Sequence, residues 1–177
     1  MKINILITLL FTLFLAACGG DTETKKPDVD YNQVRDPLIN ANKMINQSEE
    51  DQIKGYIKRH QLMMEKTTSG LRYQIYFEGK GSKVEKFCRV KLKYRLSLIN
   101  GVECYNSEKD GMKEFNVGTG EVENGLNEAV LLMKQGDKAR LIIPSHLGFG
   151  LVGDEDKIPA KAILIYDLEV FQVVQPK

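Results

Sequence analysis

The sequence predicts an α+β fold in which an antiparallel sheet curls over one short helix and a helical arm precedes the sheet. Apolar and polar residues alternate over 71–77 and 90–98, which is the period of half-buried strands. Apolar residues recur at helical spacing over 36–60 and again over 123–133. An antiparallel sheet with one apolar face needs a cover, and the single short helix among the strands supplies it.

The composition excludes several classes of protein. Of the 177 residues, 42% are hydrophobic and 28% are charged, so the chain is neither disordered nor collagen-like. Lysine and arginine number 25 against 24 acidic residues, and a formal net charge of +1 gives no field that would hold a nucleic acid. The three cysteines and two histidines lack the spacing of a four-ligand zinc site, and no nucleotide-binding or catalytic-triad motif is present. We therefore expect no metal, no cofactor and no nucleic-acid partner.

The first residues predict export and a lipid anchor. Lys2 precedes an apolar run over 5–15, which is shorter than the roughly 20 residues that a membrane-spanning helix needs, so 1–17 is interpreted as a signal peptide. The string Leu-Ala-Ala-Cys that ends at Cys18 resembles a bacterial lipobox, which implies cleavage before Cys18 and attachment of lipid to it. The alternative is an ordinary signal peptide that happens to contain a cysteine. We expect a protein of the cell envelope that is extracytoplasmic and lipid-anchored to a bacterial membrane.

A tether and a helical arm are predicted next. Residues 18–35 are polar and have almost nothing to bury, so they predict a flexible tether. Over 36–66 the pattern predicts two helices, one that begins near Pro37 and a second that begins at Ser48. The apolar stripes of these helices must be buried either against the following domain or against a second copy, so a homodimer through the arm is one of two alternatives.

The remaining residues, 67–177, are predicted to form one domain. Further strands are expected over 139–143 and 162–174, and an Asn-Gly pair after the second strand suits the turn of a hairpin. Cys88 and Cys104 lie in this domain. In an oxidising compartment they form either a disulfide or two partly buried thiols.

A series of short motifs runs in order through this domain, and in order and spacing it resembles an FKBP-type peptidyl-prolyl cis-trans isomerase. The leader, the arm and the Pro-Ser-His-Leu-Gly-Phe-Gly stretch further resemble the gliding-motility-associated lipoproteins of that family. The motifs are Gly70-Leu71-Arg72-Tyr73, Val90-Lys91-Leu92-Lys93-Tyr94, Phe115-Asn116-Val117-Gly118, Val122-Glu123-Asn124-Gly125-Leu126, Met133-Lys134-Gln135-Gly136-Asp137, Pro144-Ser145-His146-Leu147-Gly148-Phe149-Gly150, Ile158-Pro159 and Leu164-Ile165-Tyr166-Asp167-Leu168-Glu169.

The resemblance implies a strongly bent antiparallel sheet wrapped around the 123–133 helix, with an apolar hollow between them. The substrate would be the proline of a polypeptide, and the activity would assist the folding of exported or envelope proteins. The backbone amide of Glu123 is expected to bind a substrate carbonyl, while its acidic side chain points elsewhere. By matched position the floor is Leu126, where the family usually has tryptophan, and the other residues of the hollow are Tyr94, Phe115, Val122, Phe149, Ile158 and Tyr166.

The sequence also departs from the family pattern. Cys104 and Tyr105 occupy the positions of a Phe-Asp pair, so a wall aromatic and a buried carboxylate are both replaced, and Lys113 occupies a position that is often aromatic. If the strand register holds, the side chain of Tyr105 faces away from that of Cys104. The departures imply an isomerase of reduced activity and keep two alternatives open. One is a non-catalytic module that binds a proline-containing segment of an envelope partner, and the other is a purely structural lipoprotein subunit.

Overall fold

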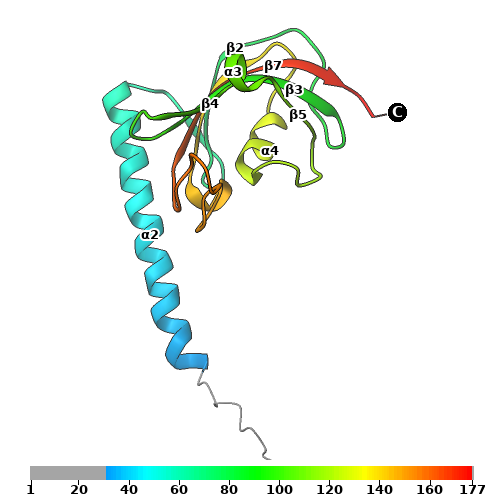
Figure 1. Cartoon of the computed structure of the whole chain (residues 1–177). Helices are drawn as coiled ribbons and strands as arrows, with labels where there is room; N and C mark the ends of the chain where they lie inside the picture. Colours follow the sequence, from blue (N-terminus) through cyan, green and yellow to red (C-terminus); the bar gives the residue numbers. More distant parts are fainter. Residues whose placement is uncertain (1–30, 177) are drawn as a thin grey trace, which may run out of the picture. The chain divides into compact units, whose positions relative to one another are not determined.

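The computed structural model describes residues 31–176 (Figure 1). The predicted signal peptide, Cys18 and most of the predicted tether lie outside these residues. Within the described part, no helix is long and apolar enough to cross a membrane. By its internal contacts the chain divides into two units between Ile39 and Asn40, and the residues predicted to form the hollow all belong to the second unit, Asn40–Lys177.

The second unit contains a seven-stranded antiparallel sheet, so the α+β prediction is confirmed. The order of the sheet is β1-β2-β6-β7-β3-β4, and β5 also pairs with β3. The strands are β1 (Glu65–Lys66), β2 (Arg72–Phe77), β3 (Arg89–Leu98), β4 (Glu103–Asn106), β5 (Lys113–Asn116), β6 (Lys138–Ile143) and β7 (Leu164–Val174). The helices are α2 (Tyr31–His60), α3 (Ser107–Asp110), α4 (Asn124–Val130) and the 3₁₀ helix η1 (Ser145–Leu147).

Strand β3 organises the sheet. It pairs along its whole length with β7, from Arg89 opposite Val174 to Leu98 opposite Leu164. On its other edge β5 pairs with its first half and β4 with its second half. The predicted hairpin turn joins β3 to β4 through Gly101, which has a φ of +91° and donates its N–H to the carbonyl of Leu98. Register shifts in both the β3–β7 and the β3–β4 ladders bend the strands, because a bulge inserts an unpaired residue.

Helix α4 lies on the concave side of the sheet, as predicted (Figure 1). Leu126, Ala129 and Val130 of α4 are buried in the main apolar core. Gly125 permits the close approach of α4 to β6, because a Cβ at this position would lie only 2.5 Å from Cγ2 of Ile143. The sheet and this helix together enclose the core on which the candidate site is built.

The prediction of two helices in the arm was wrong, because α2 runs without a break from Tyr31 to His60. It starts inside the segment that was expected to be tether. Ser48, expected to cap a second helix, lies in the interior of α2 and accepts a hydrogen bond from Nε2 of Gln52 at 3.5 Å. A serine inside a helix is tolerated when its side chain faces solvent, as that of Ser48 does, so the serine does not end the helix here.

The C-terminal half of α2 packs on its own domain. Ile53 is buried in a second apolar cluster with Ile142, Ile163 and Ile165 of the sheet region. The buried carboxylate of Glu49 accepts hydrogen bonds from the amide (3.0 Å) and the hydroxyl (2.5 Å) of Ser145. The apolar stripe around Ile53 is therefore covered by the following domain, which is one of the two alternatives for its burial.

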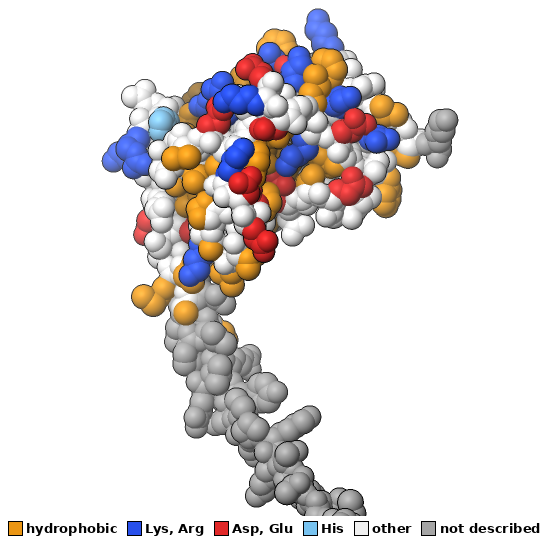
Figure 2. All heavy atoms as spheres, in the orientation of Figure 1, with side chains coloured by type: hydrophobic (Ala, Val, Ile, Leu, Met, Phe, Trp, Pro, Cys, Tyr) orange, Lys and Arg blue, Asp and Glu red, His pale blue; other side chains and the backbone are white. Residues whose placement is uncertain are grey.

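Two further expectations concern the charge of the surface and the state of the two cysteines. Figure 2 shows basic and acidic side chains interspersed on the visible face, as expected for a chain with almost no net charge. Cys88 and Cys104 are both buried, and each is a free thiol. Of the two alternatives for this pair, the structure contains the two thiols.

Candidate functional site

The predicted site residues come from separate segments and meet in the main core. Phe115, Leu126, Ile158 and Tyr166 are fully buried members of that cluster, and Tyr94, Val122 and Phe149 are partly buried against it. Phe115 lies on β5, Leu126 on α4, Tyr94 on β3 and Tyr166 on β7. Val122 precedes α4, Phe149 follows η1 and Ile158 lies in the loop before β7. The structure thus brings together all seven apolar positions that the resemblance assigned to the hollow.

Two tyrosines form one wall of this cluster. Tyr94 on β3 lies opposite Leu168, and Tyr166 on β7 lies opposite Leu96, so the two tyrosines are diagonal neighbours on one face of the sheet. Their ring centroids are 6.1 Å apart and the rings are inclined by 43°. Burial raises the pKa of both phenols, and the nearby Glu123 carboxylate raises the pKa of each further.

The side chain of Glu123 points into this wall, so the expectation that it points elsewhere was wrong. It is only 3% exposed and accepts a hydrogen bond from the hydroxyl of Tyr166. Its second carboxylate oxygen lies 3.7 Å from Nζ of Lys113. A buried carboxylate requires such partners, and Tyr166 and Lys113 supply them. Glu123 also precedes α4 as its N-cap residue without a side-chain capping bond, because its carboxylate is engaged in the wall.

Lys113 is a member of the site that the sequence identified only as a departure. Its ammonium lies 5.5 Å from the ring centroid of Tyr94 and 5.9 Å from that of Tyr166. It also donates to the hydroxyl of Tyr166 at 3.4 Å. The signal in the sequence was a cationic residue at a position where the family often has an aromatic one.

Cys104 and Tyr105 occupy different environments. Cys104 on β4 is a buried member of the core, where burial raises the pKa of its thiol and the Asp154 carboxylate raises it further. The ring of Tyr105 is partly buried against the same core, but its hydroxyl donates to Asp154 and Asp156, at 2.5 and 3.2 Å. Tyr105 therefore contacts the loop before β7.

The loop from Phe149 to Ile158 is held by its backbone. Gly153 donates its N–H to the carbonyl of Phe149, and a Cβ on Gly153 would lie 2.1 Å from the carbonyl oxygen of Ile158. With a φ of +78°, position 153 requires glycine on both counts. This close approach brings the two ends of the loop, and hence Phe149 and Ile158, to the same site.

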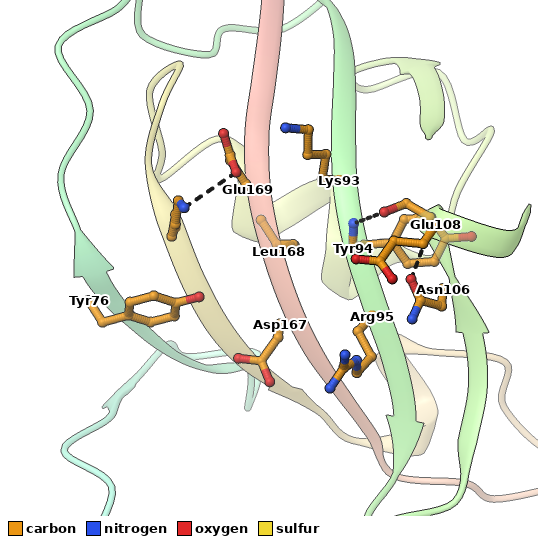
Figure 3. A pocket seen from close by; sticks show the side chains of 11 residues that line it. Tyr76, Lys93, Tyr94, Arg95, Asn106, Glu108, Asp167, Leu168 and Glu169 are labelled. Carbon is orange, nitrogen blue, oxygen red and sulfur yellow. Dashed lines mark hydrogen bonds and ion pairs between the residues drawn. The ribbon is translucent and has the colours of Figure 1, made fainter. Parts of the chain in front are cut away.

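A separate hollow of about 280 Å³ lies on the sheet (Figure 3). Its lining includes Lys93, Arg95, Asp167 and Glu169, which alternate along their strands with the residues that face the core. Tyr94 is the one residue it shares with the predicted set. The mixed charge of this hollow makes it a poor match for a proline ring, so we assign the candidate site to the core-facing side.

The comparisons with known proteins place the domain in a family. The model of the FKBP-type peptidyl-prolyl cis-trans isomerase family matches residues 80–171. FkpA of Buchnera aphidicola subsp. Acyrthosiphon pisum is 34% identical over 111 residues, which are 63% of this chain and 45% of the relative. FK506-binding protein 2 of Dictyostelium discoideum is 40% identical over 86 residues, 48% of this chain and 65% of the relative. The chain thus spans between about half and two thirds of the length of these relatives.

Solved structures agree on the fold. The crystal structure of AtFKBP13 superposes with a TM-score of 0.60 at 28% identity and covers 63% of this chain and 98% of the other. FkpA from Escherichia coli has a TM-score of 0.62 at 23% identity, with 98% of this chain and 82% of the other covered, and it supports the fold alone. Because the family model spans more than half of the sequence, this chain belongs to the FKBP-type peptidyl-prolyl cis-trans isomerase family.

Proposed function

We propose that the protein is a peptidyl-prolyl cis-trans isomerase whose substrate proline packs against the apolar cluster of the candidate site. The observation that supports this most strongly is the convergence of seven residues from separate segments in one cluster. Motif order selected these residues without reference to their positions in space. The cluster consists of Tyr94, Phe115, Val122, Leu126, Phe149, Ile158 and Tyr166.

The reaction needs few polar groups. Rotation about a peptide bond has a barrier of roughly 18–20 kcal/mol, whereas cis and trans X-Pro differ by only about 0.5–1 kcal/mol. The enzyme therefore has to lower the barrier without altering the equilibrium. A planar amide is more dipolar than a twisted one, so an apolar environment disfavours the ground state more than the transition state. Tyrosine, phenylalanine and branched aliphatic side chains provide such an environment.

The backbone amide of Glu123 supports the proposal. Within the described residues it donates to no protein acceptor, while the carbonyl of the same residue accepts from the amide of Asn127 at the start of α4. An amide at the edge of the cluster can therefore donate to a carbonyl of the bound polypeptide. This is the role that the family resemblance assigns to the position.

A peptide assay tests the proposal. A soluble form of the protein that begins at Asp21 should accelerate cis-trans isomerisation of a Leu-Pro tetrapeptide in proportion to its concentration. Binding of the same peptide, followed by NMR titration, distinguishes the outcomes. Binding without acceleration would reject the enzyme and support the second candidate function.

That second candidate is a non-catalytic module that binds a proline-containing segment of an envelope partner. Three observations favour it: Cys104 replaces a wall aromatic, Tyr105 replaces a carboxylate, and the buried Glu123 carboxylate lies among the residues of the hollow. Each of these three features changes the surroundings of the substrate amide, and none of them disrupts the fold.

We further propose that the protein assists the folding of exported or envelope proteins from a lipid anchor at Cys18, facing an extracytoplasmic space. The support is the signal-peptide pattern of residues 1–17 and the lipobox-like string before Cys18. The resemblance to gliding-motility-associated lipoproteins of the family points to the same location. Cys18→Ser should abolish acylation in a radiolabelled-lipid assay without a change in the folded domain, and acylation that persists would reject the anchor.

We also propose two alternatives, a homodimer through α2 and a purely structural lipoprotein subunit. Met44 on α2 is 74% exposed, whereas Ile53 further along the helix is already covered by the domain. Sedimentation of the protein that begins at Asp21, compared with Met44→Glu, tests the dimer. A monomer at all concentrations would reject it.

A further inference from the structure

The candidate site contains a cation that an apolar hollow does not require. Lys113 on β5 lies near the rings of both Tyr94 and Tyr166, and its ammonium is 3.7 Å from a carboxylate oxygen of Glu123. Tyrosine faces attract a cation through the ring quadrupole, and the carboxylate attracts it by charge. The ammonium is therefore held at the site by three of the residues that form it.

The two charges lie at different depths. The side chain of Glu123 is 3% exposed, whereas that of Lys113 is 25% exposed. A polypeptide that approaches from solvent therefore meets the ammonium before the carboxylate. The 3.7 Å separation is also longer than a direct hydrogen bond, so the three N–H donors of Lys113 are not saturated by Glu123.

The two carboxylates whose charges raise the pKa of Tyr94, the ring beside this lysine, are already engaged in hydrogen bonds. Glu123 accepts from the hydroxyl of Tyr166. Asp110, the other carboxylate that acts on Tyr94, accepts from the backbone amide of Asn106 at 2.7 Å. An added carboxylate from a substrate would therefore find Lys113 as a donor that still has hydrogen-bonding capacity.

We propose that Lys113 is a specificity-determining residue that favours prolines flanked by an acidic residue. The proposal rests on the proposed binding of prolines at this site and adds the class of substrate. A glutamate or aspartate beside the proline accepts a hydrogen bond from the Lys113 ammonium at the rim. A lysine or arginine in the same place faces a like charge.

The test compares glutamate with glutamine, which differ in charge but little in size, immediately before and immediately after the proline of a tetrapeptide. At low salt we expect kcat/KM to favour glutamate by about two- to five-fold in at least one of the two positions, as for a partly exposed ion pair. Lys113→Met should bring the ratio close to one, and Lys113→Arg should preserve it. Lys80→Met, which removes an exposed lysine between β2 and β3, is the matched control and should leave the ratio unchanged.

Two further measurements keep the outcomes distinct. If Lys113→Met fails to fold because Glu123 has lost its cation, the double variant Lys113→Met with Glu123→Gln removes both charges and should also give a ratio close to one. If no peptide is isomerised, the enzyme is rejected, and the dissociation constants of the same peptides from NMR titration decide the role of Lys113. No preference for glutamate at either position, or a preference that survives Lys113→Met, overturns the proposal.

Discussion

The hydroxyl of Tyr105 donates a 2.5 Å hydrogen bond to Oδ2 of Asp154, and this bond joins β4 to the loop that carries Ile158. The other oxygen of Asp154, Oδ1, accepts a hydrogen bond from the backbone amide of Ile158 at 2.7 Å. One carboxylate therefore connects β4 to the backbone of the loop. The bond to Asp154, together with burial, raises the pKa of Tyr105. The residue that replaces the family's acid thus positions a wall residue of the candidate site.

Tyr105→Phe should loosen this loop. The variant keeps the ring but removes the donor, and we expect a loss of about 0.5–1.5 kcal/mol in the free energy of unfolding. Hydrogen exchange at the amide of Ile158 should become faster. Tyr73→Phe is the matched control, because Tyr73 donates a 2.5 Å bond to Glu65 at an exposed place outside this loop. Equal protection of the Ile158 amide in both variants would contradict the role of Tyr105.

The ion pair that anchors α2 should make stability depend on pH. Glu50 accepts two 2.8 Å hydrogen bonds from the buried Arg72. Desolvation alone would raise the pKa of Glu50, but the bonds and the charge of Arg72 lower it below its ordinary value of 4.5. A lowered carboxyl pKa contributes stability that is present above the unfolded pKa and is lost as the pH falls through the folded one.

We therefore expect the urea midpoint to fall as the pH decreases below about 4.5. Glu50→Gln should lower the midpoint at neutral pH, where a buried Arg72 would lose its counter-charge. The two proteins should converge at acid pH. Glu65→Gln, at an exposed carboxylate, serves as the control. Parallel curves for the wild type and Glu50→Gln from pH 3 to pH 7 would show that this ion pair does not contribute.

The long strands could be predicted because each carries its own periodic signal. β3 and β7 have enough residues for apolar and polar positions to alternate several times, so their bounds follow within two residues. β4 and β5 have four residues each, and an alternation that short is not distinguishable from a loop. Their strand character depends on pairing with β3, which is a tertiary contact.

For the candidate site, the sequence could predict that the apolar residues share one cluster, but it could predict neither the inclusion of Lys113 nor the orientation of Glu123. The motif order was sufficient to place Phe115, Leu126 and Tyr166 in one cluster. The inward turn of the Glu123 side chain depends on Lys113 from β5 and Tyr166 from β7, which are distant in sequence. No local pattern around Glu123 carries that information.

Phe149→Ala tests whether the loop after η1, which carries Phe149, forms part of the substrate site. Phe149 is only partly buried against the core, so its loss should reduce stability less than the loss of a buried aromatic. We expect kcat/KM to fall by about ten-fold or more, which is roughly 1.4 kcal/mol of transition-state stabilisation. Phe171→Ala is the matched control, since Phe171 is an exposed aromatic on β7 with Lys93 over its ring. Turnover that is equally reduced in both variants would place the site elsewhere.

The double variant Cys104→Phe with Tyr105→Asp restores the family pair, and the structure predicts that it will not restore activity. Cys104 is a buried member of the main core, so a phenylalanine there should overpack the core at a cost of about 1–3 kcal/mol. An aspartate at 105 would lose the bond to Asp154 and place a third negative charge beside those of Asp154 and Asp156. We therefore expect a lower urea midpoint and no gain in kcat/KM.

The two single variants show how much each substitution contributes to the lower urea midpoint of the double variant. Cys104→Phe alone should account for the overpacking, and Tyr105→Asp alone should show the faster exchange of the Ile158 amide that is expected of Tyr105→Phe. Cys88→Phe, a second buried thiol replaced in the same way, controls for the general cost of added volume. A rise in kcat/KM of three-fold or more with an unchanged midpoint would show that the site has kept space for the aromatic wall. In that case the missing aromatic wall at position 104 would limit the rate.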